Sequence, residues 1–246
     1  VGGGQEINTG EAGISDWIRA VNETFPEWKV YLSKHLTDKE YAEGNVAELI
    51  SNNPNAYQVE QLHLSVSMRS FRAENLSKFV HAILDRNAEQ ARNIYQEIRE
   101  KYPIVLTRDI NKAKSWVREH AREDERYGAL ASSKGQRLKP DALTLLPPNS
   151  SEVEVTHWFL GDNKDVQSSY YMEEVATEFQ VQGLELDWAI VAWDADMRFD
   201  STTSSWKQYS FRGSKWMNIN NEKIRKYQIN AYRVILTRAR RGMVIY

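Results

Sequence analysis

The stretch PIVLTRDINKAKSWVREHAR, residues 103–122, decides the fold class of this chain. Its first five residues are a short apolar run, which predicts a strand. Over residues 111–122 the pattern changes, because Ala113, Trp116 and Val117 fall on one face of a helix. A strand that leads into an amphipathic helix is the repeating unit of α/β proteins.

Further strands and helices alternate on either side of this unit. We expect helices over residues 14–21, 76–84, 88–102 and 226–236, and strands over residues 57–64, 173–178, 187–193 and 243–246. This alternation predicts an α/β fold, with a mainly parallel sheet flanked by helices. In such sheets, ligands bind beyond the carboxyl ends of the strands.

Composition and turn-forming residues indicate how the chain is divided into segments. We expect a connecting segment over residues 1–56 and a main domain over residues 57–246. Glycine and prolines indicate a surface excursion over residues 134–151, and polar residues indicate a hairpin insertion near 200–221. The chain starts with Val1-Gly2-Gly3-Gly4, without an initiator Met or a signal-peptide pattern, so we expect it to be a piece of a longer protein.

The composition excludes several classes of protein. Among the 246 residues there is no apolar run long enough for a membrane helix, and there is no cysteine for disulfides or thiolate metal sites. The five histidines are scattered without paired spacing, which argues against a zinc enzyme. We therefore expect a cytoplasmic protein with no membrane partner and no metal site of its own.

The net charge of −2 hides two segments of opposite sign. Residues 151–200 carry 12 acids and two bases, whereas residues 201–246 carry 10 bases and one acid. One interpretation is that the two segments neutralise each other in the fold. The other is that the basic end meets phosphate, and charge alone does not distinguish one phosphate group from a nucleic-acid backbone.

Three clusters of residues carry possible chemistry. The first, residues 177–187, passes from one strand into another through a Gln-Gly turn at Gly183. The second, residues 232–242, places Arg238 where a helix gives way to a strand, and the third, residues 67–72, contains an arginine between a strand and a helix. Arginine suits phosphate because its fork of donors matches phosphate oxygens. Taken singly, each cluster also fits an ordinary loop, a solvated surface or a basic helix end.

In sequence order, these clusters resemble the motifs of the second RecA-like domain of superfamily 1 helicases. Gly4-Gln5 resembles the end of motif III, and Arg69-Ser70 resembles part of motif IV. Residues 177–187 resemble motif V, with its core at residues 183–185, and residues 236–240 resemble motif VI. The resemblance covers nearly the whole chain.

Within that superfamily, residues 4–11 and 178–185 are most similar to a bacterial helicase-like group related to the Schlafen helicase domain. The chain departs from the common motifs at Gly3, at Ser67-Met68 and at Glu178, where motif V usually has a histidine. The resemblance implies the fold of a P-loop NTPase second domain that lacks the P-loop itself.

The resemblance also implies roles for individual residues at an ATP site. Gln5 senses the γ-phosphate or positions the attacking water, and Arg69 and Arg238 are arginine fingers that stabilise charge on the transferred phosphoryl group. Glu185 contacts the ribose of the nucleotide, and Gly183 lets the backbone approach the ligand closely.

Further residues complete the implied nucleotide and nucleic-acid sites. Thr237 belongs to the nucleotide-binding set, and Thr177 contacts a nucleic-acid phosphate or couples the two sites. Lys207, Arg212 and Lys215, in the polar insertion, are the candidates for contacts with the phosphates of single-stranded or duplex nucleic acid.

One absence limits what this chain does alone. A P-loop requires Gly-Lys followed by Ser or Thr, and none of the 12 glycines is followed by lysine. We therefore expect an N-terminal RecA-like domain of the same protein to hold ATP with Mg²⁺, and this chain to be inactive as an ATPase by itself.

Two functions are compatible with this sequence, and a third is weaker. The first is the C-terminal motor domain of an ATP-dependent DNA/RNA helicase or translocase. The second is a helicase-like regulatory module that binds nucleic acid and uses ATP as a switch without unwinding. The third is a nuclease, which is suggested by polar and acidic residues near one strand: Asp162, Glu174, Glu178 and Gln180. Their spacing is poor for metal-dependent cutting.

Overall fold

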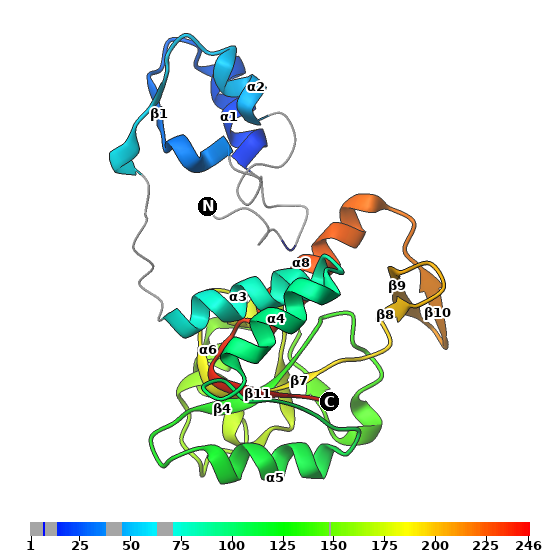
Figure 1. The fold of residues 1–246 in the computed structure, drawn as a ribbon. Coiled ribbons are helices and arrows are strands. Elements are labelled where there is room, and N and C mark those ends of the chain that lie inside the picture. Colours follow the sequence, from blue (N-terminus) through cyan, green and yellow to red (C-terminus); the bar gives the residue numbers. More distant parts are fainter. Residues whose placement is uncertain (1–6, 8–13, 38–45, 63–70, 148) are drawn as a thin grey trace. The chain divides into compact units, whose positions relative to one another are not determined.

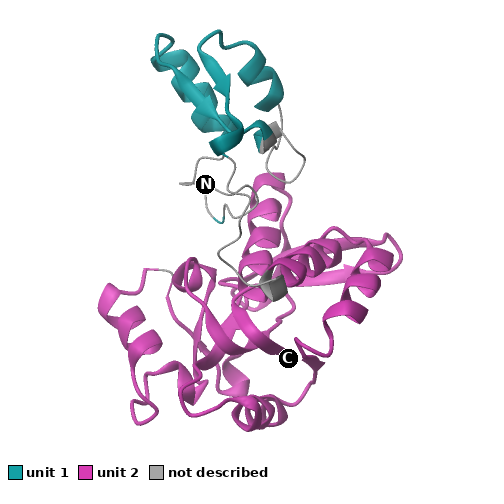
Figure 2. Ribbon diagram, turned by 60° about the vertical axis from the view of Figure 1, so that its left-hand side comes forward, with its two compact units in different colours: residues 1–68 teal, residues 69–246 magenta. Residues whose placement is uncertain are grey.

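The computed structural model describes residues 7, 14–37, 46–62, 71–147 and 149–246. The chain forms two compact units, Val1–Met68 and Arg69–Tyr246 (Figure 2). The first unit therefore continues beyond residue 56, to the segment that precedes the first long helix of the second unit.

The first unit is small and is built around two helices and a pair of parallel strands. Its elements in chain order are α1 (Ile14–Thr24), β1 (Val30–Leu32), a 3-10 helix (Lys34–Thr37), α2 (Val46–Ser51), β2 (Ala56–Gln58) and a 3-10 helix (Glu60–Leu62). Ile18, Val46 and Ile50 form its core. The helix expected over residues 14–21 is confirmed.

The strand expected over residues 57–64 is wrong in length and in place. Between residues 56 and 62 only Ala56–Gln58 forms a strand, and it pairs with β1 in the first unit instead of joining the main sheet; residues 63 and 64 lie outside the described residues. The alternation of polar and apolar residues does not reflect a strand with one buried face, because Tyr57 and Leu62 are exposed. Tyr57 stacks on Tyr31 at the surface of the small sheet, with ring centroids 5.4 Å apart.

The second unit contains a six-stranded sheet in which every pair of neighbours is parallel. The strand order is β3-β11-β7-β4-β6-β5. The strands are β3 (Ile104–Leu106), β4 (Tyr127–Ala131), β5 (Thr144–Leu145), β6 (Glu174–Ala176), β7 (Leu186–Ala192) and β11 (Ala239–Ile245). The predicted α/β fold with a mainly parallel sheet is confirmed.

Helices cover both faces of this sheet (Figure 1). They are α3 (Phe71–Leu84), α4 (Ala88–Ile98), α5 (Ile110–His120), α6 (Glu152–Leu160), α7 (Glu178–Val181) and α8 (Glu222–Leu236). In Figure 1, α5 runs along one face, while α3, α4 and α8 lie on the other. Ala113 and Val117 of α5 pack against Ile190 of β7 and Val244 of β11 in the main core, as their helical spacing predicts.

The excursion expected over residues 134–151 is only partly at the surface. It contributes the edge strand β5, and three of its four leucines, Leu138, Leu143 and Leu146, are buried. These side chains anchor the segment on the sheet, because a proline-rich loop with several leucines still has apolar surface to bury.

The polar insertion forms a three-stranded antiparallel sheet, as a hairpin was expected there. Its strands are β8 (Met197–Asp200), β9 (Ser205–Arg212) and β10 (Lys215–Asn218), in the order β10-β9-β8. The β9–β10 turn uses Gly213 with a φ of +61°. α8 follows this sheet and begins earlier than expected, because the Asn221 side chain accepts a hydrogen bond from the Ile224 N–H at 3.2 Å.

Candidate functional site

Two of the sequence clusters meet at one edge of the main sheet. Gly183 and Glu185 lie directly before β7, and Thr237 and Arg238 lie directly before β11. β7 and β11 are parallel neighbours, and the Leu186 N–H donates to the Arg238 carbonyl at 2.9 Å. This edge carries the amino ends of the strands, whereas the general rule for parallel sheets places ligands beyond the carboxyl ends.

The Arg238 side chain is buried at this edge, with 2 % of its surface exposed. Its Nε donates to the Val234 carbonyl at 3.0 Å, and its Nη1 lies 3.5 Å from the Leu184 carbonyl. Its Nη2 donates to the Thr237 hydroxyl oxygen at 3.2 Å. These three acceptors are neutral oxygens, and together they orient the guanidinium.

Thr237 supports Arg238 and also ends α8. Its hydroxyl lies 2.9 Å from the Arg233 carbonyl and 3.0 Å from the Val234 carbonyl, and it accepts from Arg238. These contacts occupy the hydroxyl within the protein. The geometry therefore gives Thr237 a positioning role toward Arg238 in this conformation.

The turn before β7 depends on glycine. Gly183 has a φ of +90°, a conformation that L side chains rarely adopt, and no atom lies within 4 Å of the position that a Cβ would take. The backbone here is therefore open on the side where a ligand can approach. The same turn presents the Leu184 carbonyl to Arg238 and leaves Glu185 partly exposed beside it.

The arginines that follow Arg238 are paired with acids. Arg240 Nη2 lies 2.7 Å from Asp187 Oδ1, and Arg241 Nε lies 2.9 Å from Glu125 Oε1. Burial acts to raise the pKa of Glu125, but the Trp188 indole N–H and the positive charge of Arg241 hold it below its usual range. Neutralisation between the acidic and basic segments thus accounts for Arg240.

Thr177 lies at the opposite edge of the sheet. It follows β6, whose Ala176 is level with Val191 of β7, since both pair with Leu130. Five residues of β7 separate that level from Leu186, which is about 16 Å at the usual rise of a strand. Thr177 therefore does not share the edge that Arg238 occupies.

A buried polar network surrounds Thr177. Its backbone N–H and its hydroxyl both donate to Gln180 Oε1, at 2.9 and 2.7 Å, and Gln180 Nε2 donates to the Pro147 carbonyl. The next residue, Glu178, accepts from the Ser133 N–H at 2.8 Å and from the Ser133 hydroxyl at 2.6 Å. Burial raises the pKa of Glu178 above its usual range.

These contacts bear on the nuclease interpretation. Both carboxylate oxygens of Glu178 face Ser133 and not a shared metal position. In the part of the chain that the structure describes, no group of three or more His, Asp or Glu side chains is placed to hold a metal ion. Nothing in this geometry supports metal-dependent cutting.

The structure separates the three cations predicted to contact nucleic acid. Lys207 pairs with Arg198 across the β8–β9 ladder, and its Nζ lies 3.8 Å from Asp200 Oδ2. Arg212 and Lys215 pair with each other near the β9–β10 turn. Because side chains alternate along a strand, Lys207 lies on one face of the small sheet and Arg212 on the other.

Two predicted catalytic residues, Gln5 and Arg69, lie outside the described residues. Their roles, and the convergence of Arg69 with Arg238, stay predictions. Of the proposed set, the structure brings together Gly183, Glu185 and the pair Thr237-Arg238.

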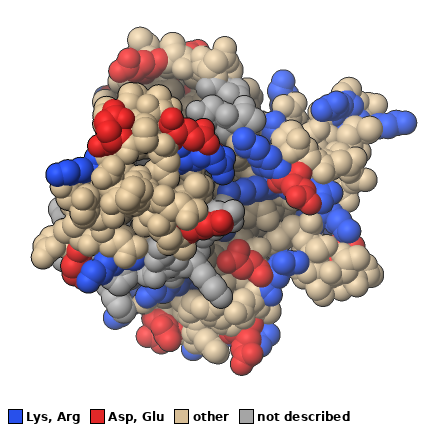
Figure 3. Space-filling view, turned by 90° about the horizontal axis from the view of Figure 1, so that it is seen from above, with Lys and Arg blue, Asp and Glu red and all other residues tan. Residues whose placement is uncertain are grey.

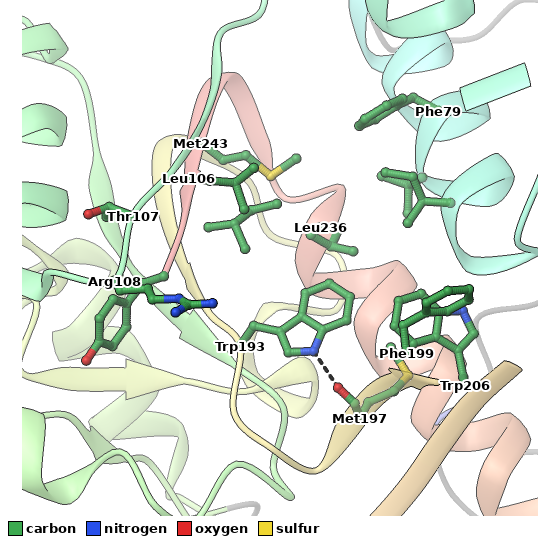
Figure 4. A pocket seen from close by; sticks show the side chains of 14 residues that line it. Phe79, Leu106, Thr107, Arg108, Trp193, Met197, Phe199, Trp206, Leu236 and Met243 are labelled. Carbon is green, nitrogen blue, oxygen red and sulfur yellow. Dashed lines mark hydrogen bonds between the residues drawn. The ribbon is translucent and has the colours of Figure 1, made fainter. Parts of the chain in front are cut away.

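An apolar cavity of about 780 Å³ lies beside α3 and the carboxyl ends of β3 and β11 (Figure 4). Trp193, Phe199 and Trp206 line one wall. The indole N–H groups of Trp193 and Trp206 donate hydrogen bonds to the carbonyls of Met197 and Leu84, respectively. The cavity can accept an apolar or flat aromatic group, and sequence reasoning missed it because its lining comes from separate segments.

A further group missed from the sequence is a set of arginines placed over aromatic rings on the small sheet. Arg198 lies over Tyr209 and Trp216, and Arg137 lies over Phe211. The alternation of Lys207, Tyr209 and Phe211 along residues 205–212 is the signal from which this face could have been predicted.

The chain was compared with protein families, curated proteins and solved structures. A family model described as Schlafen group 3, DNA/RNA helicase domain, matches residues 1–246. No curated protein and no solved structure matches the chain. Among the described residues, no helix combines the length and the apolar character that crossing a membrane requires.

Proposed function

As the chain belongs to the Schlafen group 3 family of DNA/RNA helicase domains, we propose that it is the second RecA-like motor domain of an ATP-dependent DNA/RNA helicase or translocase. In this proposal the domain supplies arginine fingers and nucleic-acid contacts. Another RecA-like domain of the same protein supplies the phosphate cradle and the magnesium ligands, because no Gly-Lys pair of a P-loop occurs in this chain.

The observation that carries the proposal is the meeting of the two clusters at the amino edge. The Arg238 guanidinium lies against the Leu184 carbonyl, between Gly183 and Glu185, although these residues are more than 50 positions apart in the sequence. A buried arginine, an open glycine turn and a carboxylate suit the phosphate, the backbone approach and the ribose of a nucleotide.

The residues of this edge fit the terminal phosphate and the ribose of ATP but not the whole triphosphate. Bound ATP with Mg²⁺ supplies the phosphoryl group that is transferred to water. Arg238 and Arg69 stabilise negative charge that develops on that group, and Gln5 positions the water. Glu185 accepts hydrogen bonds from the ribose hydroxyls, and Thr237 keeps the Arg238 guanidinium in position.

Arg238 has to exchange acceptors when it reaches a phosphate. Hydrogen bonds from a guanidinium to phosphate are charge-assisted and stronger than those to the Leu184 and Val234 carbonyls. When Arg238 leaves the Leu184 carbonyl, the turn after α7 is free to move. The amino end of α7 is capped by Thr177. This short connection is the physical route by which nucleotide is coupled to the nucleic-acid edge.

The same exchange also supports the alternative function, a nucleic-acid-binding module that uses ATP as a switch. Glu178, which stands where motif V usually has histidine, is held by Ser133 in this conformation. Strand displacement by the complete protein separates the two functions, because a switch changes nucleic-acid affinity with ATP but unwinds no duplex.

The direct test of the proposal is ATP hydrolysis by the complete protein and by its Arg238→Gln variant. We expect the variant to lose about 10³-fold or more in kcat, as for other arginine fingers. Arg240→Gln is the matched control, because Arg240 is paired with Asp187 at 2.7 Å and should leave kcat within about threefold. Equal rates for the Arg238→Gln variant and the unmodified protein would remove Arg238 from the site.

A further inference from the structure

One face of the β8–β10 sheet combines aromatic rings with cations. The pairs Arg198–Lys207 and Phe211–Trp216 lie side by side across the ladders, and alternation along β9 places Tyr209 on the same face. We call these five residues the aromatic–arginine face. The rings are half-buried and the Arg198 and Lys207 side chains are exposed, so the face is presented to solvent.

The guanidinium groups on this face are stacked on the rings. The Arg198 guanidinium lies 4.3 Å from the centre of the Tyr209 ring and 5.6 Å from that of Trp216. Its Nε also donates to the Ala195 carbonyl at 2.7 Å, which fixes its plane. The rings of Phe211 and Trp216 pack edge to face, with centroids 5.1 Å apart. The result is a preformed set of flat surfaces.

The aromatic–arginine face is continuous with the carboxyl edge of the main sheet. Ser133, which holds the residue after Thr177, begins a loop whose Arg137 lies 5.9 Å above the Phe211 ring. The Arg137 N–H donates to Asp194 Oδ2 at 2.8 Å, which anchors that loop beside the insertion. A track therefore runs from Thr177 to Trp216 over contacting elements.

The track carries three cations, beside the carboxylates of Asp194 and Asp200. Arg137, Arg198 and Lys207 line it, and Lys207 is the one of these whose charge is offset by an ion pair, with Asp200, among the contacts described. In Figure 3, blue side chains gather on the right of the view, the side on which Figure 1 places β8, β9 and β10. A polyanion with flat groups along it is complementary to such a surface.

We propose that single-stranded nucleic acid lies along the aromatic–arginine face. Its bases stack on the guanidinium planes that the rings of Tyr209, Phe211 and Trp216 support. Its phosphates contact the cations of the track. Stacking of this kind tolerates any base, as a motor that moves along a strand requires. The inference rests on the nucleic-acid part of the proposed function and assigns that function to one face of the insertion.

The other face of the same sheet provides a matched control. Met217 follows Trp216 in β10, points to the opposite face and is 51 % exposed. Both residues lie on the same strand, but only Trp216 belongs to the aromatic–arginine face. A protein partner, in contrast, would have to strip water from the arginines that cover each ring, which is costly without matched acids.

The test is binding of a fluorescein-labelled oligothymidylate or oligouridylate of about 20 nucleotides to the complete protein, measured by anisotropy at several salt concentrations. We expect Trp216→Ala to weaken binding roughly 5- to 100-fold, and Met217→Ala to leave it within about twofold. Arg198→Gln should lower the slope of log affinity against log salt by about one, whereas Arg198→Lys should keep the slope and still weaken binding.

The outcomes separate this inference from the proposed function. Wild-type affinity and salt slope in both the Trp216→Ala and Arg198→Gln variants, in protein that binds the strand and hydrolyses ATP, would overturn the inference alone. Absence of strand binding by the unmodified protein would overturn the nucleic-acid part of the function as well. Arg198 is exposed, so its variants report on binding even if Trp216→Ala lowers stability.

Discussion

At the scale of single residues, Asp196 is the buried carboxylate with the clearest consequence. Its Oδ1 accepts from the Tyr232 hydroxyl at 2.5 Å, and its Oδ2 accepts from Gln228 Nε2 at 2.9 Å. Burial raises its pKa from 3.8 to about 6, against the effect of these hydrogen bonds, and the nearby Asp194 adds to the rise. The folded protein therefore binds this proton more tightly than the unfolded chain does.

The sign of the pH dependence follows from that difference. The stabilising contribution of Asp196 is complete below the unfolded pKa and is lost as the pH rises through about 6. Between about pH 5 and about pH 8 the loss amounts to about 1 kcal/mol of unfolding free energy. We expect Asp196→Asn to remove this slope, as measured by urea denaturation across that range.

The partly exposed Asp200 is the control for this prediction. Hydrogen bonds from Thr202 and Thr203 lower its pKa to about 2, so it is ionised in folded and unfolded protein throughout the same pH range. Asp200→Asn should therefore leave the slope unchanged. Identical slopes for the unmodified protein and the Asp196→Asn variant would show that Asp196 does not carry the dependence.

Arg238 shows how far the sequence alone reaches at this scale. Its position at a helix-to-strand junction, and its suitability for phosphate, were predictable from residue type and order. Its burial and its contacts with the Leu184 and Val234 carbonyls were not, because they depend on the register of β7 against β11. The pairing of Arg240 with Asp187 was hidden for the same reason.

At the scale of the elements, the turn before β7 links the backbone to the candidate site. Gly183→Ala places an L residue at a φ of +90°, although no atom obstructs the new Cβ. We expect a cost of about 1–2 kcal/mol in unfolding free energy from backbone strain. We also expect weaker binding of a fluorescent ATP analogue to the complete protein, because the methyl group stands where the ligand approaches.

The Gly213→Ala variant distinguishes the effect of backbone strain on stability from a local effect of Gly183 on nucleotide binding. Gly213 also has a positive φ and open space around its Cα, but it lies in the β9–β10 turn. This variant should lose similar stability and keep its affinity for the ATP analogue. Equal losses of nucleotide affinity in both variants would show that general destabilisation, and not the Gly183 turn, is responsible.

The elements with long apolar runs were predictable, and those built from small residues were not. β7 is buried along all seven residues, and the apolar run over residues 188–192 indicated a strand. β4 was missed because its sequence YGALA lacks β-branched residues. It occupies the sheet interior since Gly128 allows close approach: a Cβ there would lie 2.9 Å from the Ser169 Cβ.

At the scale of the whole chain, the second unit separates two candidate sites on opposite edges of one sheet. The amino edge carries Gly183, Glu185 and Arg238, and the carboxyl edge carries Thr177 and leads to the aromatic–arginine face. The sequence motifs identified both sets, but the general rule for parallel sheets predicted only the carboxyl edge. Residues 177–187 reach both edges because α7 leads from the carboxyl end of β6 to the amino end of β7.

The most direct measurement is a structure of the complete protein with ADP, aluminium fluoride and Mg²⁺, a mimic of the phosphoryl-transfer transition state. The account predicts that the Arg238 guanidinium leaves the Leu184 carbonyl and contacts the fluoride, with Arg69 on the same group and Glu185 at the ribose. A nucleotide bound away from this edge, with Arg238 still on the carbonyls of Val234 and Leu184, would contradict it.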